Sequence, residues 1–308
     1  MPLLRVASFL CCWLFTSLSL AVTPVLKLEK IHSNIYVIFG QLSDRTPQNL
    51  GNNANFGFIV ADNSVVLIDS GASYLGAKAI HALIKSVTSK PVSHVINTGG
   101  QDHRWLGNDY FASQGAKIIA SKAAVLDHKT RTEAQFERLR RSIGEDKLEH
   151  TRARYADITF EKHYRFTVDG INIEIVHPGV SHTPGDSFVW LPDTKTVFTG
   201  DIMYTQRMLG VIPVSNSQSW LKAFEQVKAL QPSTVIPGHG KTQDLKTAVA
   251  DTYNYLKFLR DEIRQFMDDG HGIENIGKLN QQGFRYLKNF EILKGRNAQK
   301  VFEELEWE

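Results

Sequence analysis

The stretch "STVIPGHGK", residues 233 to 241, places a histidine between two glycines directly after an apolar run. Val235 and Ile236 indicate a short buried strand, and Pro237 ends it. His239 therefore stands at the mouth of a strand, where glycine on each side lets backbone, metal or substrate approach closely. We expect a functional loop here, because binding residues gather on loops that a rigid scaffold positions.

Two further stretches have the same design. In "VSHTPGDSFVWLP" (residues 180–192) His182 lies in a turn between an apolar strand and the next hairpin, and in "VFTGDIMY" (residues 197–204) Asp201 follows an apolar strand. Together with His239 they supply two imidazoles and one carboxylate from three strand ends. That composition suits an open metal site, which must leave a position for water.

The stretch "INTGGQDHRWLGN" (residues 96–108) follows another apolar strand and adds Asp102 and His103 to the group. Two interpretations of Asp102 stay open: it orients or activates a water as a catalytic base, or it caps the helix that begins near Arg104.

The rest of the chain alternates between strands and helices, which predicts an α/β fold. Strands are expected at 31–40, 55–71, 92–98, 117–121, 164–170, 171–179, 186–194, 196–201 and 233–237. Helices are expected at 74–89, 104–115, 122–154, 217–230 and through most of the chain beyond residue 245. The polar loop from Gln41 to Ala54 is long enough to flank a site.

Composition narrows the classes of partner. The 308 residues include 35 basic and 32 acidic side chains, a formal net charge of +3, without clusters of basic residues. Nucleic acid is therefore a poor partner, and we expect a small-molecule substrate.

The first 21 residues have the features of a signal peptide. Arg5 precedes an apolar run from Val6 to Leu20, which is shorter than the ~20 residues of a membrane span, and no stop-transfer pattern follows. We expect a periplasmic or secreted protein without stable membrane insertion after cleavage; the alternative is an uncleaved anchor. Both cysteines, Cys11 and Cys12, lie in this segment, so a mature protein would hold metal through His, Asp and Glu, which suits zinc, iron or manganese.

The motifs, taken in order, resemble those of the metallo-β-lactamase fold superfamily. The resemblance runs from "NIYVI" to "PGHG" and includes "LIDSG" at residues 67–71, "SHTPGDSFVWLP", "FTGD" and "IPGHG". It implies a four-layer αββα sandwich at residues 22–245, with extra C-terminal helices at 246–308 packed on it. In this family the loop at residues 41–54 corresponds to a substrate-covering flap.

The family's second motif, Asn-Thr-His-x-His-x-Asp-His-x-Gly-Gly-Asn, is altered here. An ungapped match keeps four positions (Asn97, Thr98, Gly107 and Asn108), replaces the two leading histidines by Gly99 and Gln101, and puts His103 at the aspartate. A match slipped by one residue instead aligns Asp102 and His103 with the family's Asp-His. Both registers direct His103 into the site.

The resemblance implies one zinc ion held among four side chains: His103, His182, Asp201 and His239. A first metal position would have only His182, Asp201 and a weak amide ligand from Gln101, so it is expected to be weak or empty. A second metal position would have His103, Asp201 and His239. Asp69 and Arg104 would hold the ligand loops by hydrogen bonds.

The function implied is an exported metal-dependent hydrolase that cleaves an ester, thioester, lactam or similar bond through a metal-bound hydroxide. Two alternatives stay open. One is a non-catalytic binding or accessory protein that has kept the fold, which the loss of histidine at Gly99 and Gln101 motivates. The other is an atypical β-lactamase with a single metal.

Overall fold

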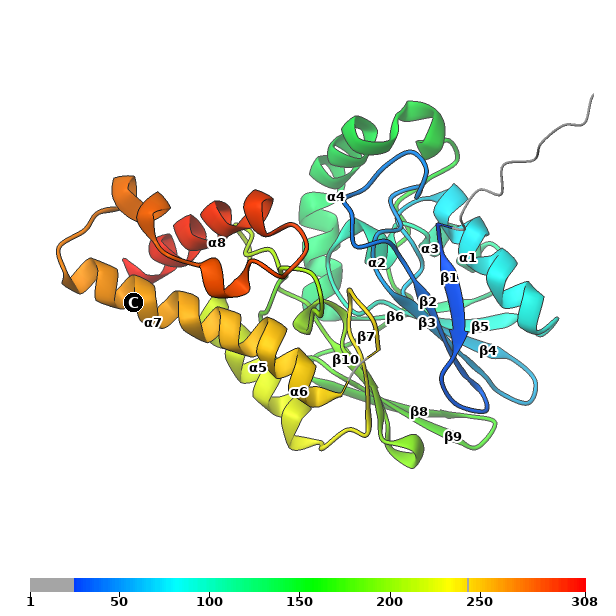
Figure 1. Cartoon of the computed structure of the whole chain (residues 1–308). Helices are drawn as coiled ribbons and strands as arrows, with labels where there is room; N and C mark the ends of the chain where they lie inside the picture. The colour runs from blue at the N-terminus through cyan, green and yellow to red at the C-terminus, as the bar shows by residue number, and fades with distance from the viewer. Residues whose placement is uncertain (1–24, 243) are drawn as a thin grey trace, which may run out of the picture.

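The chain folds around two stacked β-sheets (Figure 1). The computed structural model describes residues 25–242 and 244–308, so the expected signal peptide lies outside the described residues. The first sheet has seven strands in sequence order, the last four of them parallel. They are β1 (Lys27–Lys30), β2 (Ile35–Phe39), β3 (Phe56–Val60), β4 (Val65–Ile68), β5 (Val92–Ile96), β6 (Lys117–Ser121) and β7 (Ile158–Phe160).

The second sheet has five strands in the order β12-β11-β10-β9-β8. They are β8 (His163–Val168), β9 (Ile171–Val176), β10 (Phe188–Leu191), β11 (Thr196–Phe198) and β12 (Thr234–Ile236). β8 to β11 run antiparallel, whereas β11 and β12 are parallel because the helix α5 (Ser217–Ala229) connects them.

A continuous apolar core joins the two sheets. Ile68 and Ile96 of the first sheet, and Val189 and Phe198 of the second, belong to one buried cluster. Each fully buried aliphatic side chain of this kind stabilises the fold by about 1.5–3 kcal/mol. Burial on both faces explains why β4 and β10 are apolar at every position.

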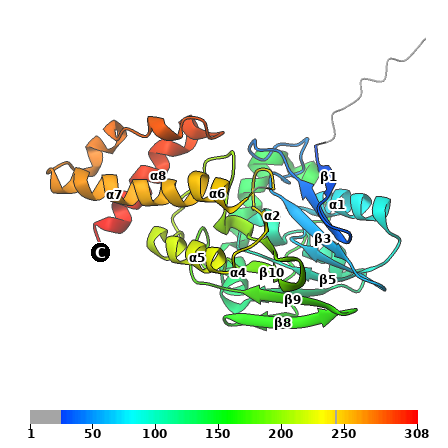
Figure 2. The same ribbon diagram turned by 60° about the horizontal axis from the view of Figure 1, so that its bottom comes forward.

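Helices cover both outer faces, which confirms the predicted αββα sandwich (Figures 1 and 2). On the side of the first sheet these are α1 (Tyr74–Val87), α3 (Asn108–Ala112) and α4 (Lys122–Ile143); on the side of the second sheet they are α5 (Ser217–Ala229), α7 (Asn254–Asp268) and α8 (Phe290–Leu305). Ser73, Ser121 and Asn216 cap α1, α4 and α5 with their side-chain oxygens. Short helical turns complete the list: α2 (Asp102–Trp105), α6 (Leu245–Ala248), a π-helical turn (Val249–Tyr253) and 3₁₀ turns at Glu145–Leu148, Pro192–Thr194, Gly200–Ile202, Ile273–Lys278 and Gln282–Phe284.

The C-terminal helices share a core with the sandwich. Trp220 and Phe224 of α5 belong to the same buried cluster as Leu259 of α7 and Val301 of α8. The C-terminal extension is thus packed on α5, which covers the second sheet. The domain boundary near residue 245 stays a prediction.

Several elements differ from those that the sequence predicts. The edge strand β1 is polar and the strand β7 has three residues, so neither has an apolar pattern long enough to be recognised. The helix expected at 104–115 is divided at Gly107, where a Cβ would lie 2.1 Å from the carbonyl oxygen of Ser70. The helix expected to reach residue 154 ends at Ile143, because Gly144 has φ +92°.

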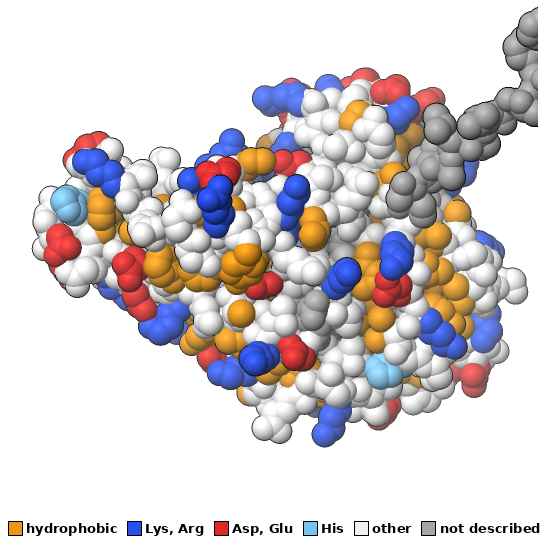
Figure 3. Space-filling view, viewed as in Figure 1, with side chains coloured by type: hydrophobic (Ala, Val, Ile, Leu, Met, Phe, Trp, Pro, Cys, Tyr) orange, Lys and Arg blue, Asp and Glu red, His pale blue; other side chains and the backbone are white. Residues whose placement is uncertain are grey.

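The surface mixes charges of both signs. On the face in Figure 3, basic and acidic side chains are interspersed, and apolar side chains lie along the C-terminal helices. Within the described residues we find no helix that combines the length and apolar character of a membrane span.

Candidate metal centre

Loops at one end of the two sheets carry the site. Asp69 follows β4, α2 follows β5 through the loop 97–101, Asp201 lies in the turn after β11, and His239 follows β12. Asp69 anchors the loop after β5, because Thr98 donates to it from both its backbone nitrogen and its hydroxyl, each at 2.7 Å. Its φ of +63° is unusual for an aspartate and fixes this orientation.

Three of the predicted ligands come together. His103, Asp201 and His239 each offer a ligand atom, and these atoms all lie within 4.8 Å of one another. The Nε2 of His239 is 3.3 Å from Asp201 Oδ1, and the Nε2 of His103 is 3.5 Å from Asp201 Oδ2. All three side chains are buried. His182 is not part of this three-residue cluster, which corresponds to the second metal position.

His239 is oriented as a metal ligand requires. Its Nδ1 lies 2.9 Å from the carbonyl oxygen of Asn53, which can only accept, and 3.2 Å from Nη1 of Arg207, which can only donate. The shorter contact, to the carbonyl oxygen, favours a proton on Nδ1. The Nε2 lone pair then faces a carboxylate oxygen of Asp201, an arrangement of two acceptors that a cation between them would stabilise. Burial, followed by the charge of Arg207, holds the pKa of His239 well below its ordinary value, so the ring is neutral.

His103 is held differently, through the guanidinium of Arg45. Arg45 Nη2 lies 2.9 Å from His103 Nδ1 and can only donate, so Nδ1 accepts and Nε2 carries the proton. This Nε2 is buried and has no hydrogen-bond partner among the described residues. Burial and the neighbouring Arg104 lower the pKa of His103 to about 3. Ligation through Nε2 therefore requires Arg45 to release Nδ1.

Arg104 joins the two carboxylates Asp69 and Asp201. Its Nη2 donates to Asp201 Oδ1 and its Nη1 to Asp69 Oδ2, both at 2.7 Å. Burial alone would raise the pKa of Asp201, but Arg104 and the two histidines hold it well below its usual range. Burial raises the pKa of Asp69 to about 6 despite Arg104. Asp201 is thus ionised and is a candidate metal ligand.

The first metal position is filled by protein atoms. His182 Nδ1 is 2.8 Å from the carbonyl oxygen of Gly210, so Nδ1 donates and Nε2 is a free acceptor. Gln101 Nε2 lies 2.7 Å from this His182 Nε2 and donates to it. The Gln101 oxygen accepts from Arg138 at 3.0 Å and from Arg45 at 3.4 Å, which sets the direction of the amide. Gln101 was expected to direct its amide oxygen at the first metal position. It directs its amide nitrogen there instead, and this nitrogen cannot bind a metal.

Asp102 is not a member of the three-residue cluster, although its Oδ1 lies 3.4 Å from Nδ1 of His103. It forms ion pairs with Arg45 and, at 3.4 Å, with Arg138, and its Oδ1 accepts from the backbone nitrogen of His103 at 2.7 Å. Burial would raise its pKa, but the two guanidinium groups hold it well below the usual range. A carboxylate that holds protons so weakly is a poor base. We therefore revise the predicted catalytic role: Asp102 is the first residue of α2 and positions the two arginines.

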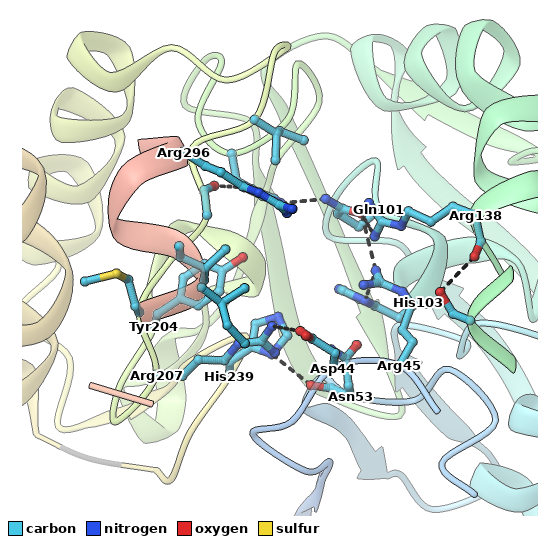
Figure 4. A pocket seen from close by; sticks show the side chains of 17 residues that line it. Asp44, Arg45, Asn53, Gln101, His103, Arg138, Tyr204, Arg207, His239 and Arg296 are labelled. Atoms are coloured by element: carbon cyan, nitrogen blue, oxygen red, sulfur yellow. Dashed lines mark hydrogen bonds and ion pairs between the residues drawn. The ribbon is translucent and has the colours of Figure 1, made fainter. Parts of the chain in front are cut away.

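The site opens into a pocket of about 360 Å³ (Figure 4). Its lining includes His103, His182 and His239, and also Tyr204, whose ring stacks on His239 with centroids 4.7 Å apart. Burial raises the pKa of Tyr204 well above its ordinary value, so its hydroxyl is a neutral donor.

Sequence reasoning missed the arginines around this pocket. They are Arg45, Arg138, Arg207 and Arg296. The seven-residue spacing of Arg131 and Arg138 places both on one face of α4, and this pattern was the available signal. The other three come from segments far apart in the chain, so no local pattern indicates them.

The family of the chain follows from a match to residues 50–239. This segment, more than half of the chain, matches the model of the metallo-beta-lactamase superfamily. The chain belongs to this superfamily, whose members are generally metal-dependent hydrolases.

Individual relatives agree with this assignment. A metallo-beta-lactamase type 2 from Elizabethkingia meningoseptica is 26% identical over 76% of this chain and 86% of its own length. The 2,4-dinitroanisole O-demethylase subunit alpha of Nocardioides sp. (strain JS1661) is 24% identical over 59% of this chain and 51% of its own.

Solved structures share the fold. A metallo-beta-lactamase from Pontibacter korlensis superposes with a TM-score of 0.62 and 21% identity, covering 75% of this chain and 99% of its own. A variant of the sec-alkyl sulfatase PisA1 superposes with a TM-score of 0.70 and 19% identity, covering 91% of this chain and 50% of its own. The sulfatase structure covers a larger share of this chain than the β-lactamase structure does. The likeness in fold therefore extends beyond the part of the chain that the β-lactamase covers.

Proposed function

We propose that the protein is a hydrolase that uses one metal ion held by His103, Asp201 and His239. The observation that carries this proposal is the buried cluster itself, in which two imidazoles and an ionised carboxylate lie within 4.8 Å of one another. An open catalytic zinc site typically has three protein ligands of these kinds. Zinc is the metal that the family favours.

The residues present fit a divalent ion. His239 directs a free Nε2 at Asp201, and the Nε2 of His103 faces the same carboxylate at 3.5 Å, where it can bind an ion once Arg45 releases Nδ1. When bound, the ion would supply an activated water and polarise the bond to be cleaved. The chain's own groups do the positioning: Asn53 orients His239, and Arg104 fixes the carboxylate of Asp201.

The substrate is proposed to be a small molecule with an ester, thioester, lactam or similar bond. Tyr204 supports this chemistry, because its neutral hydroxyl lines the pocket beside His239 and can donate to an oxyanion. The relatives named above include a β-lactamase, so a β-lactam belongs in any panel of substrates.

We also propose that the protein is exported to the periplasm or beyond, on the basis of the apolar run at residues 6–20 and the small residues after it. N-terminal sequencing of the protein recovered from a periplasmic extract would test this. A mature start near residue 22 is expected, and an intact Met1 in the cytoplasmic fraction would contradict it.

Metal stoichiometry with a matched variant tests the enzyme proposal. The purified protein is expected to retain about one zinc equivalent and to hydrolyse at least one member of a panel of esters, thioesters and β-lactams. His239→Ala should lose both properties, whereas His150→Ala, which removes an exposed histidine, should lose neither. The proposal would be contradicted if the protein took up no zinc after incubation with zinc and hydrolysed no member of the panel.

A non-catalytic binding protein is the second candidate, and two contacts favour it. Gln101 closes the first metal position by its hydrogen bond to His182, and Arg45 occupies the Nδ1 of His103. A protein that binds a ligand in the pocket but neither takes up zinc nor hydrolyses any substrate would belong to this class.

A further inference from the structure

The pocket over the candidate metal centre is rich in positive charge. Four guanidinium groups line it, and they come from four separate parts of the chain: Arg45 from the loop before β3, Arg138 from α4, Arg207 from the loop after β11, and Arg296 from α8. Asp44 is the only carboxylate among the described residues that line the pocket. Figure 4 shows the four arginines around the same space.

These charges are incompletely neutralised by the protein. Arg45 and Arg138 share the single carboxylate of Asp102, and the charge of Arg45 is the main cause that lowers the pKa of Arg138. Arg207 faces Asp44 at 3.3 Å, but the Asp44 side chain is 63% exposed. Arg296 forms no ion pair within residues 25–242 and 244–308.

Burial makes this excess costly unless an anion is present. The side chains of Arg45 and Arg207 are 12% and 10% exposed. The Nε of Arg207 is buried and has no hydrogen-bond partner among the described residues. A buried guanidinium with an unused donor is stabilised by a bound oxyanion, which accepts such donors in pairs.

Part of the pocket lining is apolar. Met208 and Ile212 line it from the loop after β11, and Ile292 and Leu293 line it from α8. Ile292 is 53% exposed, which is uncommon for a side chain of its size and leaves apolar surface for a ligand. The C-terminal helices thus supply both a charge and a hydrophobic surface to the site.

We propose that the pocket binds a small organic anion, whose oxyanion group contacts the arginines and whose short apolar body lies against Ile292 and Leu293. The volume of about 360 Å³ accommodates a molecule with roughly ten to fifteen non-hydrogen atoms. Phosphate and carboxylate groups share the required chemistry. This inference rests on the proposed function in that it treats the anion as the substrate of the proposed hydrolase. Binding of the anion itself requires neither the metal nor hydrolysis.

Calorimetric titration of the metal-free protein with three probes tests the proposal. Hexyl phosphate and hexanoate carry the two candidate head groups, and hexan-1-ol carries none. Hexyl phosphate or hexanoate should bind at least about tenfold more tightly than hexan-1-ol, and the difference should shrink as salt rises. Inorganic phosphate alone should bind more weakly than hexyl phosphate, because it lacks the apolar contact.

Two variants on the helical extension sharpen the test. Arg296→Gln should weaken the tighter of the two anionic probes about tenfold, whereas Arg285→Gln, an exposed arginine outside the pocket lining, should leave binding unchanged. Both positions are exposed, so both variants should fold. Equal effects of the two variants, or equal binding of hexan-1-ol and both anions, would overturn the proposal.

The outcome is separable from the proposed function. If the anionic probe binds the metal-free protein and the zinc-loaded protein alike, anion binding does not depend on the metal, as inferred. If zinc binding and hydrolysis are found while neither anion binds, the anion proposal fails and the hydrolase stands.

Discussion

The two halves of the site differ in what faces each histidine. In the second position His239 directs its Nε2 at the carboxylate of Asp201, and a cation would stabilise that contact. In the first position His182 directs its Nε2 at the amide nitrogen of Gln101, and the hydrogen bond already satisfies it. The side chain of Gln101, which stands where the family has a histidine, therefore decides whether His182 remains available to a metal.

The arginine network maintains this difference. Arg104 holds the carboxylate of the second position, whereas Arg138 and Arg45 hold the oxygen of Gln101 and so direct its nitrogen to His182. The same protein thus uses guanidinium groups to preserve one half of the site and to close the other.

The largest effect is expected from removing Arg104. Arg104→Ala leaves Asp69 and Asp201 buried together without their shared cation, and breaking a buried pair in this way costs about 3–5 kcal/mol. Urea unfolding measures the loss. Arg152→Ala, at an exposed arginine, should change the free energy of unfolding by less than about 0.5 kcal/mol. A loss below about 1 kcal/mol in Arg104→Ala would show that the network does not maintain the second position.

Restoring an imidazole should reopen the first position. Gln101→His removes the hydrogen bond to His182 and puts two imidazoles beside Asp201, so a second zinc equivalent is expected, measured by metal analysis after dialysis. Gln101→Ala, which removes the bond without adding a ligand, is the control and should not gain metal. Gly99→His is a poorer choice, because a Cβ at Gly99 would lie 2.5 Å from Asp186 Oδ1. No gain in Gln101→His would mean that Gln101 is not what closes this half.

Releasing His103 should strengthen the second position. Arg45→Gln frees Nδ1 of His103 to take the proton, which leaves Nε2 available, so zinc should bind about tenfold more tightly. Competition with a chelator dye measures the affinity, and Arg152→Gln serves as the control. Weaker binding in Arg45→Gln would contradict the assigned tautomer.

Acid should destabilise the fold modestly through its buried neutral histidines. His128 is buried, its Nε2 lies 3.0 Å from the carbonyl oxygen of Gly99, and burial lowers its pKa to about 3. The unfolded chain therefore takes up a proton as pH falls below 6.5 while the folded chain does not. Stability is present above pH 6.5 and is lost between pH 6.5 and about 3.

Comparing unfolding at about pH 7 and pH 5.5 isolates this contribution. His128→Gln should lose about 1 kcal/mol less than the unmodified protein over the interval, and the exposed-site variant His150→Gln should show the unmodified slope. An unchanged slope in His128→Gln would mean that this ring is protonated in the folded state.

The sequence predicted the fold and the convergence of Asp201 and His239, because each lies beside glycine after an apolar strand and the carboxyl ends of the strands meet. These are local patterns, and the tertiary structure only brings them together. The likeness to a known family added the layer order and the expectation that His103 points into the site.

The contacts that set the chemistry could not be predicted in this way. Arg45 reaches His103 from a loop 58 residues earlier, and the direction of the Gln101 amide depends on Arg138 of α4. Such tautomers and orientations follow from neighbours that are distant in the chain. The revised role of Asp102 has the same origin, since its partners are these two arginines.

Anomalous diffraction at the zinc edge, from crystals soaked in zinc, tests the central claim most directly. We predict one strong peak among Nε2 of His103, Asp201 and Nε2 of His239, with no comparable peak beside His182. A peak beside His182 instead, or none near Asp201, would contradict the account.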